Sequence, residues 1–375
     1  MSRIAFLSCH LTGTGHFVRS LAFAKAVQAR GHDVVLLSGG RPLAHLDPGP
    51  VRVVQLPPVT VRAFEFKTLR DMTGELVSEA YMAERVSVLH DAIAEFQPDG
   101  LVTELFPFGR RVLSAEFLSA IDKAREVNPE IAVLCSVRDV PEPKPKRLTE
   151  TAARLLKNYH AVLVHGDASF LPLWTTWPLP DDVAPLIHHV GYLLPPEVPS
   201  APRRDDVIVA VGGGVLGREL LEKAAEASVK SARPWRLLVG GADANTEVTR
   251  LKTEFGNPNL VVEPARPDYP ELLASAGCSI SLCGYNTALD LATCRTPAIM
   301  VPSEEADETE QLVRAQRLGN YPGLTCMRIH EVTPETLAAT ADRLATGPQR
   351  PALPLGGDDG TSAAERIEAT LAARR

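Results

Sequence analysis

Residues 278–311 read CSISLCGYNTALDLATCRTPAIMVPSEEADETEQ, and this stretch decides the fold. A short apolar run opens it, a turn at Gly284 follows, and an amphipathic segment comes next. A second apolar run ends at Pro302, before an acidic loop. Apolar runs of strand length on either side of a helical segment predict strand, turn, helix and strand, with another helix after the loop.

The Gly284 turn predicts a site for an anion. A tight turn after a parallel strand places the first backbone N–H groups of a helix at the carboxyl edge of the sheet, where they favour phosphate. Asn286 and Thr287 can cap that helix and donate to phosphate oxygens. Asp290 follows one turn later on the same face, where it can accept from both hydroxyls of a ribose, and Gln311 approaches from the next loop. The alternative is an ordinary strand–helix–strand unit with a capped helix and a solvated acid.

In this order, the residues resemble the donor-binding signature of GT-B glycosyltransferases, and in particular the MurG-like family 28. The resemblance rests on Ser281-x-x-Gly284-x-x-Thr287-x-x-Asp290, on Thr296-Pro297-Ala298-Ile299-x-Val301-Pro302 and on Gln311. The sequence departs from the family at Asp290, where Glu is usual, and at Arg314, which replaces an Asn. The resemblance implies an α/β fold of two doubly wound Rossmann-like domains facing across a cleft. It also implies donor contacts from Gly284, Tyr285, Asn286, Thr287, Asp290, Glu308 and Gln311.

Length and composition are those of a globular protein with two domains. The chain has 375 residues, of which 45% are hydrophobic and 23% charged. Its net charge is -7, which argues against a general nucleic-acid binder because such proteins carry a strong basic field.

Cysteine usage and the apolar runs predict a cytoplasmic protein. The six cysteines form no C-x-x-C pair, which favours buried free thiols over disulfides or a zinc site. The apolar run at 4–8 is too short for a signal peptide, and no run approaches the ~20 residues of a spanning helix. We expect no metal and no bound cofactor.

The amino-terminal strand and turn contain the first candidate site residue, His16. An apolar run at 4–8 leads to Gly13, Gly15 and His16, and a helical segment follows. This opening resembles that of the MurG-like group, whose Gly-rich loop ends in His. The resemblance implies donor-side roles for the two glycines, and for His16 a role in binding or as a catalytic base. The alternative is a polar residue at the start of a helix with no chemistry.

A dinucleotide-binding fingerprint is the rival interpretation of this turn. It requires a third Gly where Val18 stands, and an acid after the second strand, where Ser38 stands. The sequence therefore disfavours a nicotinamide or flavin site.

Glu104 is the leading candidate for a general base. It ends the apolar run 101–104, and an acid at the carboxyl end of a parallel strand is well placed for a site. Phe106 and Arg110 follow it, and Arg138 ends the next apolar run, so we assign these three to the acceptor side. A stiff basic loop covers 141–147. The alternatives, a capping acid and solvated arginines, are equally compatible with the sequence.

A Pro-rich segment separates two runs of alternating strands and helices. It predicts an amino-terminal acceptor-side domain at 1–195, a linker at 196–204 and a donor-binding domain at 205–345. Residues 346–375 are predicted as a loose segment and a final helix, which in GT-B proteins crosses back to the first domain. The Gly212–Gly217 turn resembles the family's phosphate loop and implies donor contacts from Gly213, Gly214 and Arg218, while Arg266 is a candidate for the donor base.

The function that this resemblance implies is a metal-independent glycosyltransferase of the hexosyltransferase type. Its donor is expected to be a nucleotide diphosphate sugar, with UDP favoured, and its acceptor a small molecule or a lipid-linked one. Aromatic and basic residues on the acceptor side allow peripheral membrane contact. The alternatives are a nucleotide-sugar hydrolase resembling the pseudaminic-acid pathway enzyme, a nucleotide-sugar 2-epimerase, and a non-catalytic nucleotide-sugar-binding protein.

Overall fold

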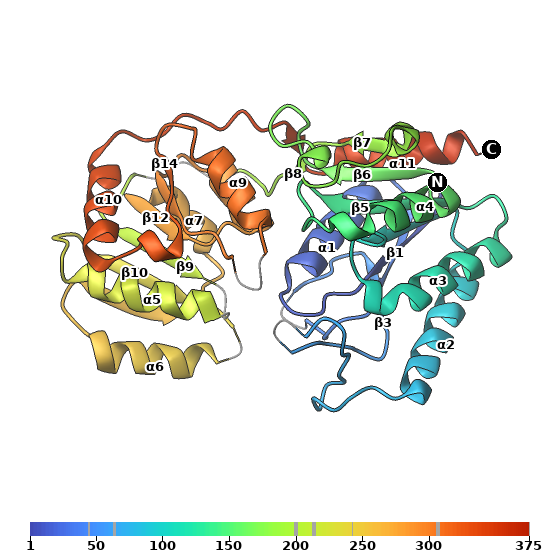
Figure 1. Ribbon diagram of the computed structural model, residues 1–375, viewed down its shortest axis with the longest axis horizontal. Coiled ribbons are helices and arrows are strands. Elements are labelled where there is room, and N and C mark those ends of the chain that lie inside the picture. Colours follow the sequence, from blue (N-terminus) through green and yellow to red (C-terminus); the bar gives the residue numbers. More distant parts are fainter. Residues whose placement is uncertain are drawn as a thin grey trace. The chain divides into compact units, whose positions relative to one another are not determined.

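The chain divides into two compact units, each built on a parallel sheet (Figure 1). The computed structural model describes residues 1–43, 46–62, 65–198, 202–211, 215–241, 243–304 and 308–374. One unit comprises Met1–Leu193 and Leu355–Arg375, and the other comprises Leu194–Pro354. The α/β class and the two Rossmann-like sheets expected from the sequence are confirmed.

The first unit contains a seven-stranded parallel sheet in the order β3-β2-β1-β4-β5-β6-β7. Its strands are β1 (Arg3–Ser8), β2 (Asp33–Ser38), β3 (Arg52–Gln55), β4 (Gly100–Glu104), β5 (Ala132–Arg138), β6 (Ala161–His165) and β7 (Ile187–His189). Its helices include α1 (Gly15–Ala29), α2 (Glu79–Phe96), α3 (Ser114–Val127) and α4 (Leu148–Asn158). The order reverses between β1 and β4, so the loops after these two strands separate there and leave room for a ligand.

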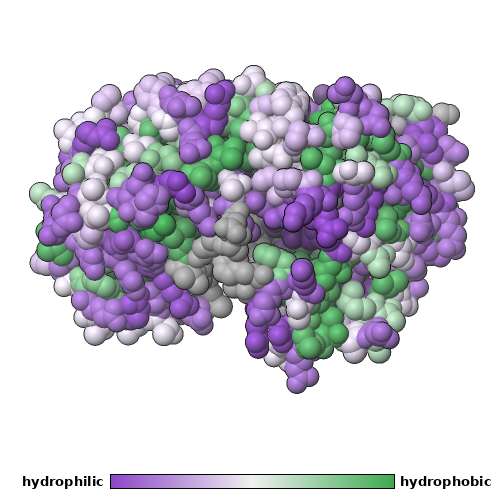
Figure 2. Space-filling model, viewed as in Figure 1, coloured by the Kyte–Doolittle hydropathy of each residue, from purple (hydrophilic) through white to green (hydrophobic). Residues whose placement is uncertain are grey.

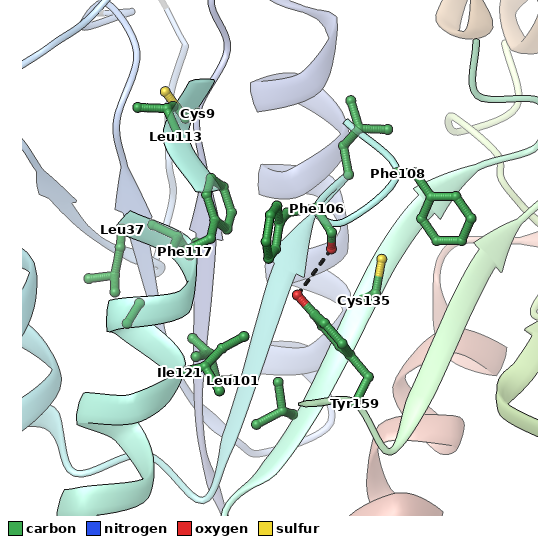
Figure 3. Close-up of a cluster of buried hydrophobic side chains, with 14 of the residues drawn as sticks. Cys9, Leu37, Leu101, Phe106, Phe108, Leu113, Phe117, Ile121, Cys135 and Tyr159 are labelled. Atoms are coloured by element: carbon green, nitrogen blue, oxygen red, sulfur yellow. Dashed lines mark hydrogen bonds between the residues drawn. The ribbon is translucent and has the colours of Figure 1, made fainter. Parts of the chain in front are cut away.

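Alternate residues along the strands of the first sheet belong to two separate hydrophobic cores. Ala5 and Leu7 of β1 pack in a core with α2, α3 and α4, whereas Ile4 and Phe6 pack with α1 on the opposite face. Because both faces are covered, the inner strands are buried on both sides, as in other parallel sheets. Figure 3 shows part of the first core, where the Phe106 and Phe117 rings stack with centroids 5.0 Å apart and the Tyr159 hydroxyl donates to the Phe106 carbonyl.

The second unit repeats this plan around a six-stranded sheet in the order β11-β10-β9-β12-β13-β14. Its strands are β9 (Val207–Val211), β10 (Trp235–Val239), β11 (Leu260–Pro264), β12 (Cys278–Ser281), β13 (Ala298–Met300) and β14 (Leu324–Cys326). Its helices include α5 (Val215–Ser228), α6 (Ala244–Phe255), α7 (Tyr269–Ser275), α8 (Tyr285–Thr293), α9 (Glu310–Leu318) and α10 (Pro334–Thr346). The order reverses between β9 and β12, so the stretch 278–311 supplies one side of this switch point.

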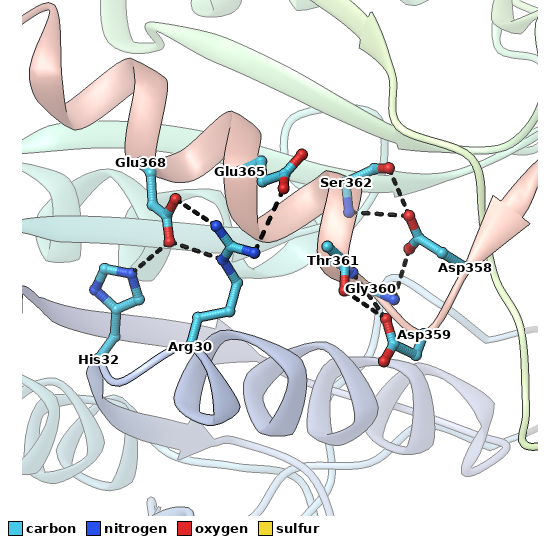
Figure 4. Close-up of polar contacts among 9 residues, drawn as sticks. All are labelled: Arg30, His32, Asp358, Asp359, Gly360, Thr361, Ser362, Glu365 and Glu368. Carbon is cyan, nitrogen blue, oxygen red and sulfur yellow. Dashed lines mark hydrogen bonds and ion pairs between the residues drawn. The ribbon is translucent and has the colours of Figure 1, made fainter.

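The carboxyl-terminal segment belongs to the first unit. Strand β15 (Gly357–Asp358) pairs with β8 (Tyr192–Leu193), and α11 (Thr361–Ala372) packs beside α1. Figure 4 shows the polar part of this contact: the Arg30 guanidinium donates twice to Glu368, at 2.8 Å each, and His32 Nε2 lies 3.0 Å from the same carboxylate. Gly360 has a φ of 103°, and a Cβ there would overlap Ala26 and Leu193, so the turn into α11 requires glycine.

All six cysteines are free, and five of them are buried, as the sequence predicted. The reducing compartment that this pattern suggests stays a prediction. Within the described ranges, no helix is long and apolar enough to cross a membrane. The face drawn in Figure 2 is largely hydrophilic, with hydrophobic residues interspersed in smaller areas.

A buried ion pair joins α2 to α3. Arg85 donates to both carboxylate oxygens of Glu116, at 2.5 and 2.9 Å, and its Nη1 also donates to the Gly39 carbonyl at 2.8 Å. The two side chains are 0% and 1% exposed. A charge without its partner is costly in such surroundings, so each of these residues requires the other.

We expect Arg85→Met to destabilise the first unit by about 3–5 kcal/mol, because it leaves the Glu116 carboxylate buried and unpaired. Urea unfolding measures this change in free energy. The double variant Arg85→Met/Glu116→Leu should recover much of the loss. Arg52→Ala is the control: its ion pair with Glu95 is exposed, and it should change stability by less than about 1 kcal/mol. Equal losses of unfolding free energy in Arg85→Met and Arg52→Ala would contradict this account.

Candidate functional site

The switch point of the first sheet brings His16 and Glu104 into contact. Glu104 is the last residue of β4, and His16 lies in the first turn of α1, which follows β1. His16 Nδ1 lies 2.6 Å from Glu104 Oε1, and the two side chains are 19% and 4% exposed. The pair therefore has a buried carboxylate behind a ring that retains access to solvent.

Arginines surround the Glu104 carboxylate. Arg19 donates to Oε1 from α1, and Arg110 Nη2 lies 3.7 Å from Oε2. Arg138, at the end of β5, lies close enough for its charge to act on His16. The structure thus brings the predicted residues Arg110 and Arg138 to the predicted pair. Arg19 was not among the predicted site residues. It follows His16 by three positions in a predicted helix, and this spacing places the two side chains on the same face.

These contacts fix the charges of the pair. Burial alone would raise the pKa of Glu104, but His16, Arg19 and Arg110 together lower it to about 2. Burial lowers the pKa of His16 to about 3, which Glu104 opposes and the charges of Arg110 and Arg138 reinforce. At neutral pH the carboxylate is therefore ionised and the imidazole neutral. Since an ionised carboxylate can only accept, Nδ1 carries the proton and Nε2 presents a lone pair.

Two further histidines lie buried at the same edge of the sheet, and the sequence analysis missed both. His10 follows β1 and His165 ends β6, and they are 3% and 1% exposed. Burial lowers their pKa values to about 4 and about 3. His165 Nε2 lies 2.9 Å from the Ser136 hydroxyl. Both histidines stand at the carboxyl ends of apolar runs in the sequence, and this position could have identified them as candidate site residues.

The acceptor-side prediction for Phe106 is wrong. Its ring is 0% exposed, stacked on Phe117, with the Arg154 guanidinium 5.4 Å from its centroid. It is a core residue because the chain turns inward directly after β4. At the Gly-rich opening, Gly15 is the first residue of α1, and a Cβ on Gly13 would meet no atom within 4 Å.

The second switch point places the amino terminus of α8 directly after β12. The helix begins at Tyr285 with Gly284 as its N-cap residue, so Asn286 and Thr287 stand within the first turn and do not cap the helix as expected. Gly284, as the N-cap residue, supplies no side-chain hydrogen bond to the start of α8. A Cβ on Gly284 would meet no atom of the described residues within 4 Å, so the described structure leaves space at this position.

Two residues of α9 hold the turn between β12 and α8. Gln311 Oε1 accepts from the Cys283 N–H at 3.0 Å and from the Ser303 N–H at 3.2 Å. Arg314 Nη1 donates to the Cys283 carbonyl at 2.8 Å, and its guanidinium lies 6.0 Å from the Tyr285 ring centroid. Arg314 is only 1% exposed. The residue that departs from the family pattern therefore fixes the backbone of the predicted anion site.

Asp290 lies in the second turn of α8, where burial raises its pKa to about 7. Its charge also acts on Tyr269, the first residue of α7. The structure brings Asp290 to the same short helix as Tyr285, Asn286 and Thr287.

The remaining predicted donor residues are less closely gathered. Arg218 is exposed in the first turn of α5, and Arg266 is paired with Asp268 at 2.7 Å. Glu308 is half-buried just before α9. Gly213 and Gly214 lie outside the described residues. In the described ranges, no three side chains of His, Cys, Asp or Glu gather as a metal site would require.

The buried histidines predict that stability falls in acid. His10, His16 and His165 stay neutral when folded but take up protons at the ordinary pKa of 6.5 when unfolded. The unfolding free energy should therefore decrease as pH falls from 6.5 towards 4, by up to about 4 kcal/mol per pH unit if all three contribute. Urea unfolding at several pH values measures this slope. His165→Gln should make the slope shallower by about 1.4 kcal/mol per pH unit. An unchanged slope would show that His165 does not titrate as inferred.

Comparison with known families matches the second unit. Residues 207–356 match the model of the glycosyltransferase family 28 C-terminal domain. Two curated relatives, from Symbiobacterium thermophilum and Synechococcus sp., are each 27% identical over 164 and 157 residues. Both are named UDP-N-acetylglucosamine–N-acetylmuramyl-(pentapeptide) pyrophosphoryl-undecaprenol N-acetylglucosamine transferase. The matches cover 40% and 41% of this chain and span 44% and 43% of the relatives, less than half of their length.

Solved structures match along the whole chain. Acinetobacter baumannii MurG gives a TM-score of 0.58 at 16% identity, covering 98% of this chain and 100% of that one. The kitacinnamycin glycotransferase gives 0.65 at 17% identity, covering 99% of each. At these identities the likeness concerns the fold, and it confirms the expected GT-B architecture. The chain therefore has the GT-B fold of these structures, and its residues 207–356 match the glycosyltransferase family 28 C-terminal domain.

Proposed function

We propose that this protein is a glycosyltransferase that moves a sugar from a nucleotide diphosphate sugar to a hydroxyl-bearing acceptor. The observation that carries the proposal is the contact of 2.6 Å between His16 Nδ1 and Glu104 Oε1 at the carboxyl edge of the first sheet. A neutral histidine oriented by an ionised carboxylate is suited to take a proton from a hydroxyl. UDP is the favoured nucleotide because the curated relatives carry it in their names.

In this proposal His16, rather than Glu104, is the base. Nε2 takes the acceptor proton as the acceptor oxygen attacks the anomeric carbon, and the nucleoside diphosphate leaves with the electrons of the broken C–O bond. Glu104 holds the ring through Nδ1 and stabilises the imidazolium as it forms. The low pKa of His16, about 3 with the opposing effect of Glu104 included, keeps Nε2 unprotonated well below neutral pH.

The amino terminus of α8 would hold the diphosphate. The backbone N–H groups at its start and the positive end of the helix dipole favour the charge that develops on the leaving group. Asp290 would accept from the ribose hydroxyls, and Gln311 and Arg314 keep the preceding turn in place. Donor binding by Gly13, Gly15, Gly213, Gly214, Arg218, Arg266 and Glu308 stays a prediction. Because backbone donors and a helix dipole can carry the diphosphate charge, we propose that no metal is required.

Arg110 and Arg138 lie close enough to His16 for their charges to act on it, and they remain our candidates for acceptor binding. The acceptor that we propose is a hydroxyl-bearing small molecule or a lipid-linked one, and acceptor screening distinguishes the two.

Removal of the base should lower turnover far more than donor binding. We expect His16→Ala to reduce kcat by about 10²–10⁴-fold, with donor affinity changed little. Glu104→Gln should also lower kcat, because it weakens the base. Release of UDP from UDP-N-acetylglucosamine and UDP-glucose, measured against a panel of hydroxyl acceptors, reports this loss. Between pH 5 and 8, the kcat of the wild type should not fall towards acid pH through protonation of His16. Chelation of divalent metals with EDTA should leave kcat unchanged.

The control for this experiment is His188→Ala, which removes a half-buried histidine from β7. Full activity of His16→Ala would exclude His16 as the base. Release of free sugar without any acceptor, lost in His16→Ala, would instead indicate a nucleotide-sugar hydrolase. Binding of the donor with no turnover across the panel would indicate a binding protein.

Donor affinity should rise with pH through Asp290. Because burial raises the pKa of this carboxyl group to about 7, it ionises between pH 6 and 8, and only the ionised form accepts from both ribose hydroxyls. We expect roughly tenfold tighter binding of UDP-N-acetylglucosamine at pH 8 than at pH 6, measured by titration calorimetry. Asp290→Asn should remove this dependence, and Glu335→Gln, at an exposed pair with Lys230, should retain it. The same dependence in Asp290→Asn would assign it to another group.

A further inference from the structure

Three arginines gather around a single carboxylate in the first unit. Arg147 Nη1 lies 3.1 Å from Glu150 Oε2, and Arg154 Nη2 lies 2.9 Å from Glu150 Oε1. Arg111 is the third, and the charges of Arg147, Arg154 and Glu150 all act on it. Both oxygens of Glu150 are therefore engaged by the other two arginines.

Arg111 has hydrogen-bond donors that nothing satisfies. Its Nε and Nη2 atoms are buried, and neither has a hydrogen-bond partner among the described residues. Burial lowers the pKa of Arg111, the positive charges of Arg147 and Arg154 lower it further, and Glu150 alone raises it. Three positive charges thus share one negative charge, and buried donors that lack a partner are costly. An anion at this place would relieve both penalties.

The surroundings add to the positive field and hold the arginines in place. Arg147 is the N-cap residue of α4 and makes no side-chain cap, while Arg154 Nη1 lies 3.3 Å from the hydroxyl of Ser114, the first residue of α3. The amino termini of α3 and α4, which carry the positive ends of the helix dipoles, therefore lie next to the cluster. The stiff loop before α4 adds the exposed residues Lys144 and Lys146. The Phe106 ring supports the Arg154 guanidinium from within the core.

We propose that Arg111, Arg147 and Arg154 form a phosphate-binding site that is separate from the His16–Glu104 pair. Guanidinium groups match the oxygens of a phosphate in a forked geometry, and Arg147 and Arg154, whose side chains are 55% and 23% exposed, offer donors beside the charge of Arg111. The phosphate can belong to a soluble molecule or to the headgroup of an anionic lipid, because the recognising chemistry is the same. The inference does not depend on the proposed transferase activity.

Calorimetric titration of the full chain with inorganic phosphate, at low ionic strength, tests the proposal. Arg111→Gln should weaken phosphate binding by about tenfold or more, since it removes a charged donor pair. Glu150→Gln should strengthen binding, because it removes the carboxylate that competes for Arg147 and Arg154. Arg52→Gln is the matched control: it removes one exposed arginine with a single ion pair elsewhere in the first unit and should change little. Thermal unfolding of each variant verifies that it is folded.

The opposite signs expected for Arg111→Gln and Glu150→Gln distinguish a binding site from a structural network. If both variants weaken binding, or if Arg111→Gln behaves like Arg52→Gln, the proposal is overturned. The difference between variants also separates this site from phosphate bound at α8, which none of them alters.

A second experiment, with lipid vesicles, shows whether the phosphate belongs to a lipid headgroup or to a soluble molecule. Sedimentation with phosphatidic acid vesicles, compared with phosphatidylcholine alone, should show binding that Arg111→Gln loses if the partner is a lipid headgroup. Phosphate binding without vesicle binding supports a soluble ligand. Absence of Arg111-dependent binding in both arms overturns the site.

Discussion

The Glu104 carboxylate is the charge around which the first unit is arranged. It is 4% exposed, at the end of a buried strand, where an unpaired carboxylate would be costly. Contacts with His16 and Arg19 of α1, and with Arg110 in the turn after β4, compensate for that cost. The helix α1 must therefore start where it does, and the turn after β4 must bring Arg110 back. The same contacts leave His16 neutral with a free Nε2, so one electrostatic requirement both fixes the turn and prepares the ring for proton transfer.

The switch points of the two sheets explain why chemistry gathers where it does. In the first unit, β1 and β4 are neighbours in the sheet although their connections run to opposite faces. His16 lies in the helix that follows β1, and Glu104 is the last residue of β4. In the second unit, β9 and β12 stand in the same relation, and α8 follows β12 directly. Parallel strands bring their carboxyl ends to one edge, so residues far apart in sequence meet there. The α11 helix completes the first unit by packing beside α1 on the same face of the sheet.

The candidate site of the second unit is built from backbone groups, whereas that of the first unit is built from side chains. Gly284 itself supplies no side-chain cap to α8, and Gln311 and Arg314 hold the turn before the helix through the Cys283 amide and carbonyl. Arg314 stands where the family has Asn, and its burial with a contact to the Tyr285 ring shows why a longer side chain is tolerated: it reaches the carbonyl from within the core. The substitution changes the support of the turn while the helix terminus itself is retained.

Local sequence determined the elements of this protein and several of its candidate residues. Apolar runs of strand length, Gly turns and helical spacing are properties of neighbouring residues, so they located β12, α8 and β13, and they placed His16, Glu104 and Asp290 at strand ends and helix starts. Tertiary structure alone decided which of these residues meet. The 2.6 Å contact of His16 with Glu104 spans 88 positions of the sequence, and only the strand order of the sheet creates it. The local sequence also does not predict that the fold buries Phe106, or that two donors of Arg111 lack partners among the described residues. Burial and charge compensation depend on how distant elements pack.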